Sequence, residues 1–64
     1  MTREIIMQAV QEECQVVTSF GTRNHLHFLD CDNTHAMFKD NGTIVIINLE
    51  EIKSLEYNHE ESKD

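Results

Sequence analysis

The segment TIVIIN, residues 43–48, follows an Asn41-Gly42 pair and constrains the fold more than any other part of the chain. Asn-Gly between two runs of strand-forming residues is the strongest short signal for a type I′ hairpin, because that turn needs a positive φ at both central residues. Side chains alternate between the two faces of a strand, so a nearly continuous apolar run indicates a strand covered on both sides. We therefore expect residues 35–48 to form a hairpin within a small antiparallel sheet.

Two turns set the expected register of this sheet. A two-residue turn at Asn41-Gly42 places Lys39 opposite Ile44, Phe38 opposite Val45, Met37 opposite Ile46 and Ala36 opposite Ile47. A weaker two-residue turn at Asp32-Asn33 places Asp30 opposite His35, Leu29 opposite Ala36, Phe28 opposite Met37 and His27 opposite Phe38. The first predicted face then holds Leu29, Ala36, Phe38, Val45 and Ile47 with His25, His27 and Cys31, and the second holds Leu26, Phe28, Met37, Ile44 and Ile46 with Asp30, His35 and Lys39.

The first part of the chain, TREIIMQAVQEE, has its apolar residues at helical spacing, with Thr2 as a candidate N-terminal cap. Residues 15–20 are rich in β-branched side chains and favour a strand. Val17 and Phe20 also continue the helical stripe, so a longer helix capped by Gly21 stays open as the alternative. After the break NLEE, the segment IKSLEY is expected to form a final short strand.

These elements predict an α+β fold in which an N-terminal helix precedes an antiparallel sheet of four to five short strands. The order of elements resembles the plan of Sm-like and SH3-like small barrels over most of the chain, which implies a curled sheet. The alternative is an open αβββ sheet. One short helix covers one face only, so we expect a barrel, a second subunit or a partner to cover the other, and we favour a homodimer. Residues 1–57 form the single expected domain, and residues 58–64 a disordered acidic tail.

The segment HLHFLDCDNTH, residues 25–35, raises the question of a metal site. A closed structural zinc site needs four ligands. The expected register puts His35 on the opposite face from His25, His27 and Cys31, so these last three are only weak metal candidates. The preferred interpretation is no metal and no cofactor, with the histidines as ordinary strand residues and Asp30 beside His35 as a cross-strand pair.

The chain is strongly acidic, with twelve Asp and Glu residues against five Lys and Arg residues and a formal net charge of −7. This charge opposes direct binding to nucleic acid and attracts a basic protein surface. We expect a small non-catalytic regulator that acts by protein–protein contact, in its sharpest form an inhibitor whose carboxylates mimic DNA or RNA phosphates. The candidate partner-binding residues are Asp32, Asp40, Glu50, Glu51 and Glu56.

Two other functions are weaker alternatives. The resemblance to Sm-like and SH3-like barrels implies a nucleic-acid-associated module, for which the available bases are Arg23, Lys39 and Lys53. A metal-responsive protein would use His25 and His27 with Cys31. No catalytic residues are predicted, since the chain offers neither a phosphate-binding glycine loop nor an oriented nucleophile–base pair. A cytoplasmic location with reduced thiols is expected, and no membrane association, because no secretory core or membrane-length apolar stretch is visible.

Overall fold

The computed structural model describes residues 1–57, and the expected acidic tail at 58–64 lies outside the described residues. The elements are α1 (Arg3–Ile6), the 3₁₀ helix η1 (Met7–Ala9), β1 (Glu13–Thr18), β2 (Gly21–Cys31), β3 (His35–Asp40), β4 (Thr43–Asn48), the 3₁₀ helix η2 (Leu49–Glu51) and β5 (Ile52–Tyr57). All strand pairs are antiparallel, and the sheet order is β4-β3-β2-β1-β5. The predicted α+β fold, a short helix followed by a small antiparallel sheet, is confirmed.

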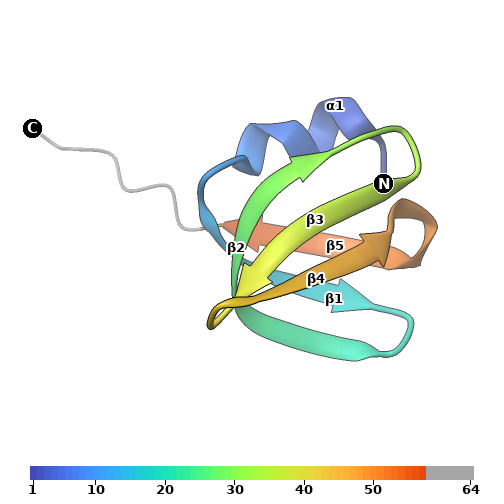
Figure 1. Ribbon diagram of the computed structural model, residues 1–64. Helices are drawn as coiled ribbons and strands as arrows, with labels where there is room; N and C mark the ends of the chain where they lie inside the picture. The colour runs from blue at the N-terminus through green and yellow to red at the C-terminus, as the bar shows by residue number, and fades with distance from the viewer. Residues whose placement is uncertain (58–64) are drawn as a thin grey trace, which may run out of the picture.

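The sheet is curled but open. Figure 1 shows β2 curving along its length while α1 and η1 lie at one end of the sheet. The hydrogen-bonded order ends at β4 on one side and β5 on the other, so these two strands do not pair within residues 1–57. The barrel closure that the resemblance implied is therefore absent, and the open form is the one observed, with five strands.

The N-terminal helix is much shorter than the sequence pattern suggested. The α-helix ends after Ile6, and after η1 the chain turns at Gln11, whose φ is +68°. The backbone N–H of Gln11 donates to the Phe28 carbonyl, and the Phe28 N–H donates to the Glu12 carbonyl. Pairing with β2 therefore takes the backbone groups that a longer helix would need. Thr2 occupies the N-cap position but makes no side-chain capping bond.

The strand interpretation of residues 15–20 is confirmed in substance, because β1 runs from Glu13 to Thr18. Its alternation is clear, because Glu13 and Gln15 are exposed, whereas Cys14 and Val16, which follow them in turn, are buried. The predicted break and final strand are also confirmed as η2 and β5, and the Asn48 side chain caps η2 by accepting a hydrogen bond from the Glu50 N–H.

The β3–β4 hairpin has the predicted register at all four predicted pairs. Asn41 and Gly42 have φ values of +52° and +90°, the positive values that a type I′ turn requires. This hairpin is therefore specified by its two turn residues together with the strand pattern on either side.

The predicted β2–β3 register is wrong. The Asp32 N–H donates to the His35 carbonyl, so the two loop residues are Asn33 and Thr34 rather than Asp32 and Asn33. A bulge between Phe28 and Asp30 then inserts one extra residue into β2. The observed pairs are Cys31 with Ala36, Asp30 with Met37, Phe28 with Phe38 and His27 with Lys39. Asp30 is therefore not opposite His35, and its side chain accepts a hydrogen bond from the Cys31 N–H.

The bulge changes the composition of the core. A one-residue slip moves side chains to the opposite face, so Leu26 and Phe28 join Ala36, Phe38 and Cys31 on the inner face. The buried apolar cluster is Ile6, Ala9, Cys14, Val16, Leu26, Phe28, Cys31, Ala36, Phe38, Leu49 and Ile52. The inner face of the curled sheet and the N-terminal helical segment therefore enclose one core.

The outer face of the β3–β4 hairpin is not covered within the subunit. Ile44 and Ile46 are 49% and 60% exposed, and Met37 beside them on β3 is 39% exposed. The inward-facing Val45 and Ile47 are half-buried against the core. The expectation that β4 is covered on both sides is thus not met by the subunit itself. No helix in residues 1–57 is long and apolar enough to cross a membrane.

Candidate functional site

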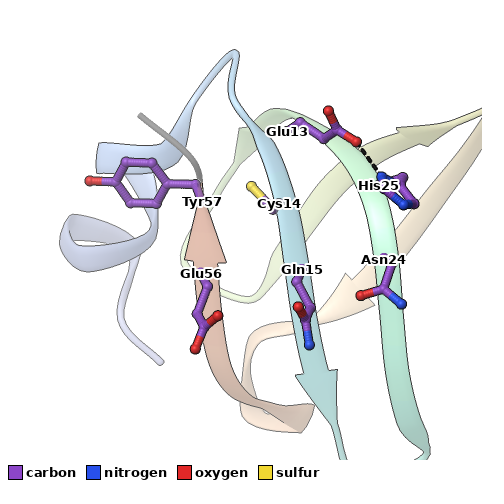
Figure 2. Close-up of a pocket in the computed structure, with 7 residues that line it drawn as sticks. All are labelled: Glu13, Cys14, Gln15, Asn24, His25, Glu56 and Tyr57. Carbon is purple, nitrogen blue, oxygen red and sulfur yellow. Dashed lines mark hydrogen bonds and ion pairs between the residues drawn. The ribbon is translucent and has the colours of Figure 1, made fainter. Parts of the chain in front are cut away.

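A polar surface spans the outer face of β2, β1 and β5. Figure 2 shows the residues that line a shallow depression there, with a volume of about 430 Å³. We call five of its polar residues the outer polar surface: Glu13, Gln15, Asn24, His25 and Glu56. It combines two carboxylates with amide and imidazole groups, and it is open to solvent.

Strand alternation and one non-local pairing build this surface. Glu13 and Gln15 point outward from β1 because Cys14 and Val16 between and after them enter the core. The pairing of β1 with β5 places Glu56 opposite Gln15 on the outer face, whereas Tyr57 lies opposite the core residue Cys14 and borders the depression from the inner side. The surface therefore joins segments that lie about forty residues apart in the chain.

A carboxylate–imidazole contact joins β1 and β2 at one side of this surface (Figure 2). His25 Nδ1 is 2.5 Å from Glu13 Oε2, and the side chains are 82% and 61% exposed. His25 has a φ of +62° and lies where the β1–β2 register shifts, so a local irregularity directs its ring toward Glu13. The neighbouring His27 contacts the side-chain oxygen of Gln11 through Nε2 at 3.2 Å. Such an exposed pair offers hydrogen bonds to a partner but contributes little to stability.

The Cys14 thiol beneath this surface belongs to the core. Its Sγ lies 3.4 Å from the Glu12 carbonyl, and the residue is only 2% exposed. Burial, with the nearby negative charge of Glu12, raises the pKa of Cys14 to about 11. The thiol is therefore protonated at neutral pH, and it lacks the thiolate character that a nucleophile or metal ligand needs.

The metal candidates His25, His27 and Cys31 do not come together. Cys31 is 8% exposed and belongs to the core, while the side chains of both histidines lie on the outer face. The prediction that the three share one face is wrong, because the bulge between Phe28 and Asp30 reverses the alternation of β2 between His27 and Cys31. Nowhere in residues 1–57 do three His, Cys, Asp or Glu side chains gather in a way that could hold a metal ion. Both cysteines are free thiols.

The predicted partner-binding carboxylates occupy different parts of the fold. Glu50 and Glu51 lie in η2, next to the β2–β3 turn that contains Asp32, because the Leu49 N–H donates to the Thr34 carbonyl across the two segments. Glu56 lies on the outer polar surface. Asp40 is at the end of β3, where its carboxylate is 3.6 Å from the Arg23 guanidinium. The five residues therefore form no single cluster.

Asp32 has a role within its own turn. Its carboxylate accepts hydrogen bonds from the backbone N–H groups of Thr34 and His35, both at 2.8 Å, and from the Thr34 hydroxyl at 3.0 Å. These bonds hold the pKa of Asp32 at about 2, well below its usual value. The bonds explain why the turn closes at Asn33-Thr34, since an Asp side chain that bonds the backbone two and three residues ahead stabilises a turn there.

The three bases considered for nucleic-acid binding are also dispersed. Arg23 lies on β2 and is paired with Asp40, Lys39 lies on β3 opposite His27, and Lys53 lies on β5 at the far end of the sheet order. They do not form a continuous basic stripe of the kind that follows a phosphate backbone.

Sequence reasoning missed three residues of the outer polar surface, namely Glu13, Gln15 and Asn24, and it also missed the neighbouring Tyr57. Alternation in ECQVVT was an available signal for the outward direction of Glu13 and Gln15. The β1–β5 pairing that brings Glu56 and Tyr57 beside them had no local signal.

Comparison of this chain with protein-family models, with curated proteins and with solved structures found no match.

Proposed function

We propose that this chain is a small acidic regulatory protein without catalytic activity, which binds a basic surface on another protein. In its specific form the partner is a DNA- or RNA-binding protein, and the carboxylates take the place of phosphates. The proposal rests on one observation: residues 1–57 carry nine acidic side chains against four basic ones, and none of these charged residues is buried.

The arrangement of the charges supports binding rather than internal stabilisation. Within residues 1–57, Arg23 pairs with Asp40, and His25 contacts Glu13 through the carboxylate–imidazole hydrogen bond. The carboxylates of η2 and of the outer polar surface project from regular backbone elements, so their Cα positions are set by the fold. A fixed negative surface accelerates encounter with a basic partner and selects against acidic ones.

The experiment has two stages. Tagged protein is used to capture proteins from its native host at about 0.05 M and about 0.5 M salt, since screening at the higher concentration shortens the range of surface electrostatics. A captured nucleic-acid-binding protein is then purified and bound to its DNA or RNA, and displacement of the nucleic acid is measured as this protein is added. The proposal requires displacement that weakens as salt rises.

Paired variants on β5 test the role of charge on one strand. Glu56→Gln removes one negative charge from the outer polar surface, and we expect partner affinity to fall about two- to fivefold, as for a surface ion pair. Lys53→Gln removes a positive charge from the same strand and should raise affinity by a similar factor. Equal affinities for both variants and the wild type, or binding that does not change with salt, would contradict the proposal.

Direct RNA binding remains the competing hypothesis and is distinguished by a gel shift with single-stranded RNA at low salt. A shift that is lost in Lys39→Gln or Lys53→Gln would favour the nucleic-acid module over the acidic regulator. We expect no shift, since the surface charge of residues 1–57 is predominantly negative.

A further inference from the structure

Within residues 1–57, strand β4 is an edge strand without the usual protection against pairing. Natural edge strands are commonly blocked by charged side chains, proline, bulges or a covering segment. The six residues of β4, Thr43–Asn48, include no charge and no proline, and the ladder with β3 runs without a bulge. The opposite edge, β5, carries Lys53 and Glu56. The two edges of this sheet therefore differ in their readiness to accept another strand.

The direction of the free backbone groups on β4 follows from one hydrogen bond. The Leu49 N–H donates to the Thr34 carbonyl at 2.8 Å, which places Leu49 among the residues that bond toward β3. Bonding residues alternate along an antiparallel strand. Ile44, Ile46 and Asn48 therefore direct their backbone N–H and C=O groups away from β3, toward the open edge.

The side chains at this edge are apolar on both faces. Ile44 and Ile46 are about half exposed on the outer face, and Val45 and Ile47 are half-buried on the inner face. A groove of about 420 Å³ adjoins β4, and the 86% exposed side chain of Phe20 helps to line it. A strand added here would gain backbone hydrogen bonds and would remove apolar surface from water at the same time.

We propose that β4 pairs antiparallel with β4 of a second copy of this chain, about a two-fold axis at Val45. In this register Ile44 lies opposite Ile46 of the second copy, and Val45 lies opposite its own equivalent. The outward-directed backbone N–H and C=O groups of Ile44 in one copy then form hydrogen bonds with those of Ile46 in the other copy. The strand is self-complementary in this arrangement, as a two-fold interface requires.

Local charge at the contact is compatible with a second copy and offers nothing to a basic partner. Each copy carries a net charge of −7, but the strand itself is uncharged, so no like charges are placed opposite one another at the contact. A basic partner would instead be drawn to the carboxylates of η2 and of the outer polar surface. Because the two copies repel at long range, screening by salt should strengthen this dimer. This dependence is opposite to that of the complex under Proposed function, so the two proposals can fail separately.

The test measures mass in solution by analytical ultracentrifugation over a range of protein and salt concentrations. The wild type should be a dimer that dissociates on dilution and becomes tighter as salt rises. Ile46→Lys places a charge at the centre of the contact and should give a monomer, with dimer affinity reduced at least tenfold. Ser54→Lys makes the same change of charge on exposed β5 and should leave the dimer intact.

Two further measurements guard against a misleading result. Circular dichroism must show that Ile46→Lys keeps the wild-type fold, and if it does not, Ile46→Pro serves instead, because it removes an N–H that makes no bond to β3. Amide exchange should show Ile44 and Ile46 protected in the wild-type dimer and unprotected in the folded variant. A wild type that is monomeric at all concentrations, an Ile46→Lys dimer, or a Ser54→Lys monomer would each overturn the proposal. The last result would point to pairing of β4 with β5 in larger assemblies.

Discussion

The rings of Phe28 and Phe38 face each other across the β2–β3 ladder, with their centroids 5.2 Å apart and their planes inclined at 39°. Both residues are fully buried. They meet only because the bulge after Phe28 turns this part of β2 toward the core. The contact thus connects a backbone irregularity with the packing of the largest side chains in the core.

We expect Phe38→Ala to lower the free energy of unfolding by about 3–5 kcal/mol, the usual loss for a large buried aromatic residue. This is a large share of the total stability of a small domain, so much of the variant should be unfolded at room temperature. Phe20→Ala is the matched control, because Phe20 is 86% exposed, and it should change stability by no more than about 0.5 kcal/mol. Urea titrations followed by circular dichroism measure both, and similar losses for the two variants would contradict the observed core.

Gly42→Ala should lower the free energy of unfolding by about 1 kcal/mol, because Gly42 has a φ of +90° that an L side chain rarely adopts. No atom lies within 4 Å of the added Cβ, so the cost is conformational rather than steric. Asn41→Gly tests the neighbouring position, where φ is also positive, and should have a smaller effect. Thermal unfolding of the two variants beside the wild type decides whether the turn has this geometry.

The Asp32 carboxylate should make stability depend on pH in the acid range. Its folded-state pKa is about 2, because Thr34 and His35 donate hydrogen bonds to it, and its ordinary value is 3.8. A depressed pKa adds stability above pH 3.8, and this stability is lost as pH falls from 3.8 toward 2. Asp32→Asn should have a lower melting temperature than the wild type at pH 7, with the difference shrinking toward pH 2. A difference that stays constant over this range would show that the carboxylate is not held by these bonds.

Both cysteines should react slowly with a thiol reagent in the folded protein, because burial raises the pKa of each. For Cys14 the raised value of about 11 adds stability below the ordinary pKa of 9.0, and that stability is lost as pH rises from 9 to 11. Absorbance with Ellman's reagent at pH 8 should report two thiols promptly in denaturant and a much slower reaction without it. Rapid labelling of Cys14 in the native protein would place its side chain outside the core.

The β3–β4 hairpin and the β2–β3 hairpin show where sequence reasoning succeeded and where it did not. Asn41-Gly42 defines its turn through backbone preference, so one local signal determined the whole register up to Ile47. At Asp32 the assumption of a two-residue loop at Asp32-Asn33 gave the wrong register. The Asp32 side chain accepts hydrogen bonds from the Thr34 and His35 N–H groups, which stabilises a loop one residue further along the chain.

The bulge in β2 had only a weak signal in the sequence. Alternation across residues 26–31 breaks at the adjacent apolar residues Phe28 and Leu29, and the packing of Leu26 and Phe28 against the core shows that the extra residue lies there. Because the bulge was not predicted, the predicted register also placed His25 and His27 on the same face as Cys31. The outer polar surface depends further on pairing between β1 and β5, which strand propensity cannot supply.

Strand β5 is an edge strand of the sheet, and it is also the last strand to be synthesised. Strands β1, β2 and β3 each pair with the next strand along the chain, so the meander from β1 to β4 can begin to form during synthesis. Ile52 and Leu55, however, pack on the core from β5, which pairs back to β1 over a long sequence separation. Productive folding on the ribosome should therefore wait until residue 57 has left the exit tunnel, and nascent chains stalled before that point should be readily cleaved by protease.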